Sequence, residues 1–178
     1  MAEIADVYKP DAKTSPALFE NINLANRIIS KENAYLIQDM LKDVIRRGTG
    51  VRANRELRRR DLSGKTGTTN DYRDAWFAGF NNDLTSVVWV GNDNYDPLGS
   101  GEQGSRTALP IWIELMRVAL KSSPQNITQM PNNMTTVRIS KSTGCPANPD
   151  TKDEIIFEIF SNESLPNCDN EDESINIF

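Results

Sequence analysis

Four consecutive residues, Lys65-Thr66-Gly67-Thr68, combine a cation with two hydroxyl groups on a short segment that is predicted to be extended. Side chains alternate along a strand, so Lys65 and Gly67 share one face and Thr66 and Thr68 share the other. An ammonium and two hydroxyl donors suit a substrate carboxylate that lies along the strand edge. Gly67 lacks a Cβ where a ligand backbone could approach. A polar edge strand with a bulge glycine explains the same residues, so the pattern alone leaves both interpretations open.

Composition and spacing exclude several other chemistries. The chain has no histidine, which rules out Ser-His-Asp and Cys-His catalysis and zinc sites built on imidazole. Proton transfer therefore falls to lysine, tyrosine, carboxyl or hydroxyl groups. A phosphate-binding loop would need a glycine where Arg59 stands, five residues before Gly64, and an apolar strand where Arg58-Arg59-Arg60 stand. The cysteines form no CxxC, so neither a metal site nor another cofactor is predicted.

Periodicity predicts the elements that must position these residues. A helix follows Ser30, a suitable N-cap, and ends at Gly48. Its apolar residues recur on one face: Ile37, Met40, Leu41, Val44 and Ile45. Aromatic and β-branched runs at residues 75–80 and 84–91 flank a polar turn, which predicts a β-hairpin. Residues 87–90 are continuously apolar and are expected to be covered on both faces.

A second helix is predicted to begin near Thr107, with Pro110 in its first turn. Apolar residues surround it nearly completely, so it is expected to be buried on all sides. Short strand-like runs follow at residues 136–139 and 155–160. The tryptophans stand in apolar runs and are expected in the core: Trp76, Trp89 and Trp112. The acids that flank the bend before the hairpin are interpreted as turn residues: Asp71 and Asp74.

The 178 residues suffice for about one domain, of the α+β class. We predict a connector over residues 1–29, a helix–sheet–helix unit over 30–121, an appendage over 122–160 and an acidic tail over 161–178. The net charge is −5, but residues 46–60 hold seven arginines and one acid. This arginine cluster is interpreted as a solvated face, with contact to an anionic polymer or a partner domain as the alternative; nucleic-acid binding is not expected. We find no secretory signal and no apolar run long enough to span a membrane.

Five segments in a fixed order carry a resemblance to a known family. They are Arg47-Gly48-Thr49-Gly50, residues 64–71 (GKTGTTND), residues 73–80 (RDAWFAGF), Val88-Trp89-Val90-Gly91 and Ala108-Leu109-Pro110-Ile111-Trp112. This set resembles the C-terminal half of the transpeptidase domain of class A bifunctional penicillin-binding proteins. The resemblance is strong over about residues 31–120 and weaker to about residue 160.

The resemblance implies part of the fold shared with serine β-lactamases, an antiparallel sheet flanked by helices, with a loop- and strand-rich appendage. It implies acyl transfer, in which a serine attacks the D-Ala-D-Ala bond of a peptidoglycan stem peptide and is also acylated by β-lactams. Thr66, Gly67 and Thr68 would bind substrate, the N–H of Thr68 would be one of two oxyanion donors, and Lys65 would join the proton relay. The implied partners are stem peptides, β-lactams and the remainder of the domain, at the periplasmic face of the bacterial inner membrane.

Two motifs of that family are absent from the chain. No lysine has a serine three positions before it, so the Ser-x-x-Lys nucleophile motif is missing. The one Ser-x-Asn, Ser174-Ile175-Asn176, stands in the acidic tail, after the strand instead of before it. The chain is therefore expected to be inactive alone, as a fragment of a catalytic domain. A non-catalytic envelope-binding module is the alternative, and a β-lactamase-type hydrolase is disfavoured because it needs the same serine motif.

Cys145 and Cys168 lie in the loop-rich final third of the chain. A disulfide and two free thiols are both compatible with this placement. A disulfide would indicate an oxidising compartment such as a periplasm.

Overall fold

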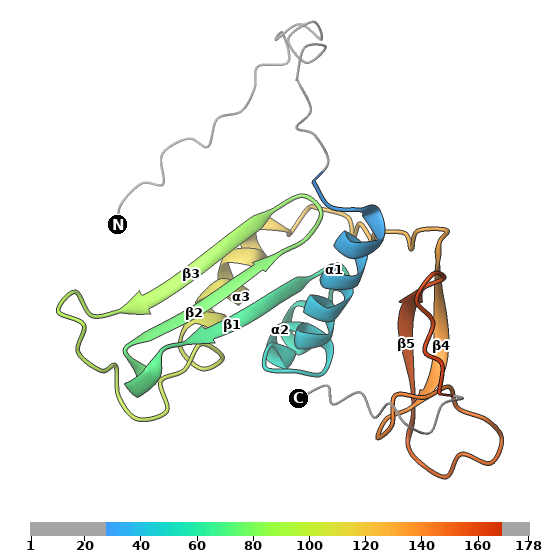
Figure 1. Cartoon of the computed structure of the whole chain (residues 1–178). Helices are drawn as coiled ribbons and strands as arrows, with labels where there is room; N and C mark the ends of the chain where they lie inside the picture. The colour runs from blue at the N-terminus through green and yellow to red at the C-terminus, as the bar shows by residue number, and fades with distance from the viewer. Residues whose placement is uncertain (1–27, 169–178) are drawn as a thin grey trace, which may run out of the picture.

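The computed structural model describes residues 28–168, and Figure 1 shows their arrangement. The helices are α1 (Lys31–Arg46), α2 (Val51–Leu57) and α3 (Ala108–Ala119), with a short 3-10 turn, η2, over Asn70–Tyr72. The strands are β1 (Ser63–Thr68), β2 (Asp74–Phe80), β3 (Thr85–Gly91), β4 (Met134–Ser140) and β5 (Ile155–Ser161). Strands β1, β2 and β3 form one antiparallel sheet in that order, and β4 and β5 form a separate antiparallel hairpin. The predicted α+β class, with an antiparallel sheet and flanking helices, is confirmed.

One face of the three-stranded sheet packs against α3, which runs behind it in Figure 1. Alternation along β2 buries Ala75 and Phe77 on the α3 side and exposes Trp76 on the other. The rings of Phe77 and Trp112 have centroids 4.8 Å apart, and Trp112 is fully buried. Removing these large apolar side chains from water supplies the main stabilisation of this layer. The buried cluster comprises Ile45, Ala53, Leu62, Ala75, Phe77, Ala108, Leu109, Trp112, Ile113, Met116 and Leu120.

In the part of the chain that the structure describes, the opposite face of the sheet is open, which corrects two expectations from the sequence. Residues 87–90 are not covered on both faces, because β3 alternates between exposed and half-buried positions and Val87 is 57% exposed. Trp76 and Trp89 are 41% and 46% exposed, and they contact each other with ring centroids 6.0 Å apart. Of the three tryptophans, Trp112 alone lies in the core. A strand buried on both faces needs a packed layer on each side, and within residues 28–168 the β3 strand has α3 on one side.

Among residues 28–168, helix α3 is likewise covered on one side, contrary to the expectation of burial all round. Its sheet-facing residues are buried, whereas Ile111, Leu115 and Val118 on the outer side are exposed. The helix is apolar nearly all round, but a helix becomes buried only where another element lies against it. Thr107 is the N-cap residue, as predicted, although its hydroxyl donates to Glu102 at 2.6 Å instead of capping the helix.

Helix α1 begins as the sequence predicts, because the Ser30 hydroxyl accepts a hydrogen bond from the Asn33 N–H at 3.0 Å. Its buried face differs from its apolar stripe. Lys42 and Ile45 are buried, while Ile37 and Met40 are exposed. Burial lowers the pKa of the Lys42 ammonium. The helix therefore lies against β1 with a partly polar side.

Asp71 and Asp74 stabilise the turn between β1 and β2. Asp74 accepts hydrogen bonds from the indole N–H of Trp89 at 2.8 Å and from the Thr69 hydroxyl at 3.2 Å, and its own N–H donates to the Thr69 hydroxyl at 2.8 Å. Asp71 adopts a positive φ of 58° and lies 3.8 Å from Arg73. Both acids thus support the turn, Asp71 within it and Asp74 at the start of β2, in agreement with their predicted structural role.

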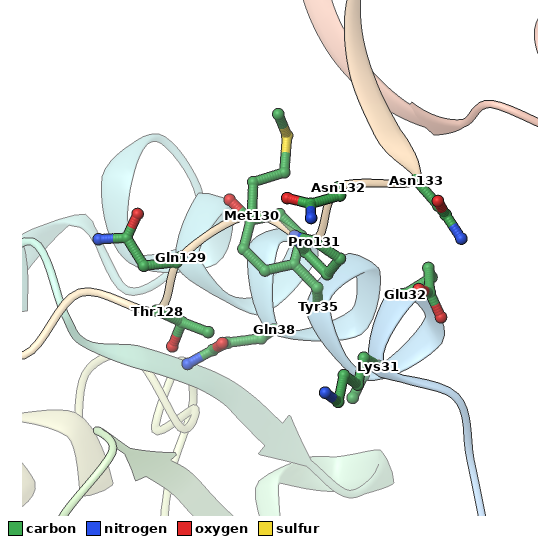
Figure 2. Close-up of a pocket in the computed structure, with 11 residues that line it drawn as sticks. Lys31, Glu32, Tyr35, Gln38, Thr128, Gln129, Met130, Pro131, Asn132 and Asn133 are labelled. Carbon is green, nitrogen blue, oxygen red and sulfur yellow. The ribbon is translucent and has the colours of Figure 1, made fainter.

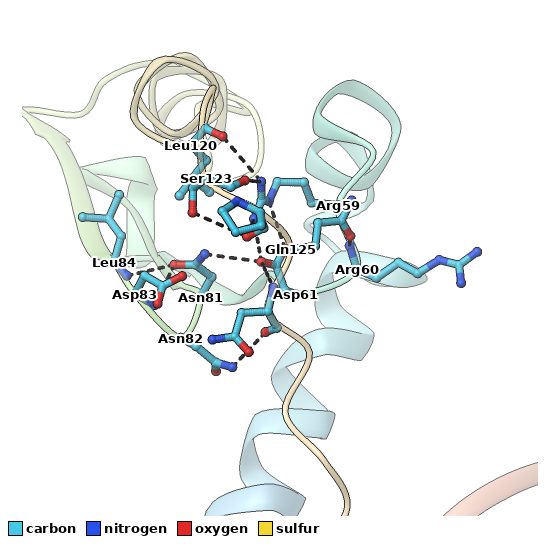
Figure 3. Close-up of polar contacts among 12 residues, drawn as sticks. Arg59, Arg60, Asp61, Asn81, Asn82, Asp83, Leu84, Leu120, Ser123 and Gln125 are labelled. Carbon is cyan, nitrogen blue, oxygen red and sulfur yellow. Dashed lines mark hydrogen bonds and ion pairs between the residues drawn. The ribbon is translucent and has the colours of Figure 1, made fainter.

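A buried ion pair joins the start of β1 to the linker that follows α3, as Figure 3 shows. Arg59 donates to both carboxylate oxygens of Asp61, at 2.9 and 2.7 Å, and to the carbonyl oxygen of Ser123 at 2.8 Å. Asn81, in the β2–β3 turn, and the N–H of Asn126 also donate to Asp61. Burial alone would raise the pKa of Asp61, but these hydrogen bonds, foremost that of Arg59, hold it below its usual value. The linker is therefore fixed to the base of the sheet.

The hairpin unit, residues 134–168, contains the two predicted strand runs, which extend to β4 and β5. In the structure Cys145 and Cys168 form a disulfide, with Cα atoms 5.8 Å apart. Arg47 at the end of α1 contacts Glu158 of β5 at 3.2 Å, which connects this unit to the remainder of the structure. No helix within residues 28–168 has both the length and the apolar character to cross a bilayer.

Candidate functional site

Strand β1 forms an edge of its sheet, so one side of its backbone has no neighbouring strand among the described residues. Lys65 pairs in register with Ala78 and Gly67 with Trp76 on the open face, whereas Thr66 and Thr68 share the face of α3. The alternation of the four residues that the sequence predicts is confirmed. Lys65 and Thr68 are exposed, and Thr66 and Gly67 are partly buried.

The backbone of β1 directs two peptide groups to its free edge. The N–H of Thr69 donates to the carbonyl oxygen of Asp74 at 3.1 Å. Residue pairs of an antiparallel ladder alternate between hydrogen-bonded and non-hydrogen-bonded, so the pairs of Thr68 and Thr66 are of the second kind. The N–H groups of these two threonines therefore point away from β2, toward the free edge.

Lys65 bends around this edge. Its Nζ donates to the carbonyl oxygen of Thr66 at 2.9 Å and lies 3.4 Å from the Thr66 hydroxyl. In a non-hydrogen-bonded pair the carbonyl group also points away from the partner strand, so the Thr66 carbonyl is accessible to Lys65 at the free edge. An ammonium, two hydroxyl groups and two N–H groups thus lie along one strand, with the two N–H groups at its free edge, an arrangement suited to an extended ligand that ends in a carboxylate.

A third hydroxyl, from Thr49, reaches the same strand. Its Oγ1 lies 2.9 Å from that of Thr66. The flanking glycines let the α1–α2 turn close tightly, because a Cβ at Gly48 would lie 2.9 Å from the Cα of Val44 and one at Gly50 would lie 2.9 Å from the Cδ1 of Ile45. No role for Thr49 is predicted from the sequence. A hydroxyl between two glycines was the signal available, but it does not indicate which strand the turn approaches.

The loop before α3 contacts the second threonine of the strand, Thr68, through the backbone of Gly104. Its N–H donates to the Thr68 hydroxyl at 3.0 Å. A Cβ on Gly104 would lie 2.3 Å from the carbonyl oxygen of Trp76 and 2.6 Å from that of Gly67, so the position requires glycine for close backbone approach. The loop before α3 therefore lies flat on the β1–β2 pair, beside the candidate site.

Close packing against Trp76 explains why residue 67, within the candidate site, is a glycine. A Cβ on Gly67 would point to the open face and lie 3.1 Å from the Cβ of Trp76. The structure thus favours tight packing against Trp76 as a reason for glycine here. Approach of a ligand backbone at Gly67 stays a prediction.

The arginine cluster is mostly engaged with acids. Helix α2, which the sequence does not predict, forms inside this cluster and is followed by Arg58 in the left-handed conformation. Four of the seven arginines have carboxylate partners: Arg46 with Asp39 and Asp43, Arg47 with Asp43 and Glu158, Arg52 with Glu56, and Arg59 with Asp61. These pairs neutralise much of the positive field that a polyanion would need. The expectation that the chain does not bind nucleic acid stays a prediction.

A cleft of about 640 Å³ lies elsewhere, between the first turns of α1 and residues 128–133 of the linker. Figure 2 shows Tyr35 and Gln38 on one side and Met130 and Pro131 on the other. Neither Lys65 nor the threonines of β1 line it. Within residues 28–168, no group of three or more cysteine, aspartate and glutamate side chains is arranged to hold a metal ion.

Comparisons with known proteins show the family of this chain. Residues 4–117 match the family described as penicillin binding protein transpeptidase domain. The match begins inside residues 1–29, the segment predicted to be a connector. The chain is 48% identical to penicillin-binding protein 1A of Pseudomonas aeruginosa over 147 residues, which are 83% of the chain and 18% of that relative. It is 38% identical to penicillin-binding protein 1A of Vibrio cholerae, covering 70% of the chain and 18% of that relative.

Comparison with solved structures also finds a penicillin-binding protein 1A. The crystal structure of penicillin-binding protein 1A from Haemophilus influenzae superposes with a TM-score of 0.69 and 34% sequence identity, over 79% of this chain and 22% of that one. The chain therefore spans about a fifth of the length of the proteins that it matches.

Proposed function

This chain belongs to the transpeptidase domain family of penicillin-binding proteins, and from that premise we propose that it is the C-terminal part of the catalytic domain of a peptidoglycan D,D-transpeptidase. In the proposed reaction a serine attacks the D-Ala-D-Ala bond of a stem peptide, D-alanine leaves, and an amine of a neighbouring stem peptide resolves the acyl-enzyme. β-Lactams acylate the same serine. The site of action is the periplasmic face of the inner membrane.

The observation that carries this proposal is the row of donors along β1, with Lys65 and the outward N–H groups at its free edge. In the proposed complex the substrate lies along that edge as an added strand. The hydroxyls of Thr66 and Thr68 bind its terminal carboxylate, and the outward N–H of Thr68 is one of two oxyanion donors. Lys65, which bends around the edge toward the Thr66 hydroxyl, supplies positive charge there and takes part in proton transfer.

The nucleophile lies outside this chain in the proposed enzyme, because the chain contains no Ser-x-x-Lys. This segment therefore positions the substrate and stabilises charge, while another part of the enzyme supplies the attacking serine. We expect the 178 residues alone to form no covalent complex with a β-lactam.

The test uses a complete protein, in which this chain replaces the aligned 147-residue region of the Pseudomonas aeruginosa relative. A fluorescent penicillin should label this complete protein, and the label should map to the part contributed by the relative. Lys65→Ala should slow acylation about 100-fold, since it removes the cation from the site. Lys121→Ala, at an exposed lysine after α3, is the matched control and should leave the rate unchanged.

Three results would overturn the proposal. One is covalent labelling of the isolated 178 residues. Another is a folded complete protein that remains unlabelled while the unaltered relative is labelled. The third is an unchanged acylation rate in Lys65→Ala. If the complete protein instead bound cell-wall polymer and was not acylated, the result would indicate the non-catalytic envelope-binding module.

A further inference from the structure

The two threonines of the candidate site differ in how their hydroxyl protons are directed. A threonine hydroxyl has one proton to donate and two positions that accept. The Gly104 N–H can only donate, so its hydrogen bond to Thr68 uses an accepting position of that hydroxyl. The proton of Thr68 is thereby left for a ligand.

Thr66 is in a different situation, because one of its neighbours is also a hydroxyl. The Nζ of Lys65, at 3.4 Å, can only donate to Thr66. The Thr49 hydroxyl, at 2.9 Å, can donate or accept. Thr66 can give its proton to a carboxylate at the strand edge only when Thr49 is the donor of the bond between them.

We infer that Thr49 is a positioning residue for carboxylate recognition. The Thr49 hydroxyl donates its proton to the Thr66 hydroxyl oxygen, and this hydrogen bond fixes the orientation of the Thr66 side chain. The Thr66 proton is then left for the substrate carboxylate. The Gly104 N–H does the same for Thr68. This inference rests on the proposed function, since it assumes that the carboxylate binds at β1.

The geometry of the turn supports a role for the Thr49 side chain beyond folding. Backbone hydrogen bonds close the turn without it: the Gly50 N–H donates to the carbonyl of Val44, and the Val51 N–H donates to the carbonyl of Gly48. Thr49 is exposed, so its methyl group adds little to the core. Its hydroxyl can therefore be removed with little effect on stability.

A hydrogen bond between hydroxyl groups also strengthens the next one in a chain, because each donor polarises its partner. With Thr49 donating, the Thr66 proton becomes a better donor to the carboxylate. Loss of one such bond changes an equilibrium or rate by about fivefold. The expected effect is therefore small enough to require matched controls.

The experiment measures the second-order acylation rate of the complete protein by fluorescent penicillin. Thr49→Val should lower this rate about fivefold without changing the melting temperature, and Thr49→Ser, which keeps the hydroxyl, should retain it. In a Thr66→Val background, Thr49→Val should cause no further loss, because its partner is already gone. Thr136→Val, at an exposed threonine of β4, serves as the matched control.

A second reagent separates positioning from a general structural role. For a penicillin with its carboxylate esterified, the Thr49→Val and unaltered proteins should react at equal rates. Equal losses with both reagents, an additive loss in the Thr66→Val background, or failure of Thr49→Ser to retain the rate would overturn the inference. If the unaltered complete protein is not labelled, or Lys65→Ala is labelled at the full rate, the proposed function fails, and this inference fails with it.

Discussion

The helix–sheet unit, residues 31–120, encloses a cluster of eleven buried apolar residues around Phe77 and Trp112. The hairpin unit buries two large apolar residues, Met134 and Ile139, and leaves Phe157 64% exposed. Both units contain antiparallel strands of nearly equal length. They differ in what lies against those strands, since α3 covers one sheet and none of the helices that the structure describes covers the other to a similar extent.

This contrast shows two ways to stabilise a short antiparallel sheet. A three-stranded sheet with a helix on one face buries enough apolar surface to hold together by packing. An isolated two-stranded hairpin does not, and here a disulfide and polar contacts limit its freedom. Ser140 and Ser142 both donate to Asp153, which holds the pKa of that carboxyl below its usual range. The candidate site lies in the packed unit, where neighbouring elements can fix donor positions.

The largest effect should follow from breaking the buried ion pair of the packed unit. Arg59→Leu leaves Asp61 as an uncompensated buried charge and should lower the free energy of unfolding by about 3–5 kcal/mol. Circular dichroism melting of the isolated chain measures the change. Arg55→Leu, at an exposed arginine of the same cluster, is the control and should melt like the unaltered chain. Equal melting of the two variants would contradict a structural role for the pair.

The next effect should be confined to the hairpin unit. Cys145→Ser removes the crosslink across 23 positions and should destabilise β4 and β5 by about 3 kcal/mol. Hydrogen exchange should then become faster in these strands and stay unchanged in β1, β2 and β3. The unaltered chain, chemically reduced, should show the same pattern. Faster exchange throughout the molecule would mean that the two units depend on each other.

A smaller effect should appear at the contact between the α3 loop and the candidate site. Gly104→Ala places a Cβ against the Trp76 and Gly67 carbonyl oxygens, so the loop must move. Overpacking of this kind costs about 1–3 kcal/mol, and it should also slow acylation of the complete protein because Thr68 loses its donor. Ser105→Ala, the neighbouring position, should do neither. An unchanged acylation rate in Gly104→Ala would show that the loop does not contribute to the candidate site.

The smallest effect concerns the open face of the packed unit. Strand β3 has a free edge among the described residues, and Val87, Trp76 and Trp89 are exposed beside it, so the isolated chain should self-associate. Val87→Lys should weaken this association about tenfold, as a charge on an edge strand blocks pairing. Sedimentation of the isolated chain at several concentrations measures it, with Thr136→Lys as the control. An unaltered chain that stays monomeric at every concentration would contradict the prediction.

Local patterns in the sequence determined most of the elements and the layout of the candidate strand. The Ser30 cap, the polar turn at Asn81 and the alternation of Lys65, Thr66, Gly67 and Thr68 all depend on residues within a few positions of each other. Capping, turn geometry and strand pleating act over that same range, so such features can be predicted from the sequence alone. Helix α2 was missed because seven residues rich in arginine show little apolar periodicity.

Tertiary structure decided which apolar faces are covered and which hydroxyls meet. Trp89 and Trp112 stand in similar apolar runs, but one is half exposed and the other buried, because burial depends on the element that lies opposite. Thr49 lies 17 positions from Thr66, and Gly104 lies 36 positions from Thr68. No local pattern encodes such a distance. These contacts exist because α1 and α3 pack against the same sheet, and that packing is set by the side chains of the whole unit together.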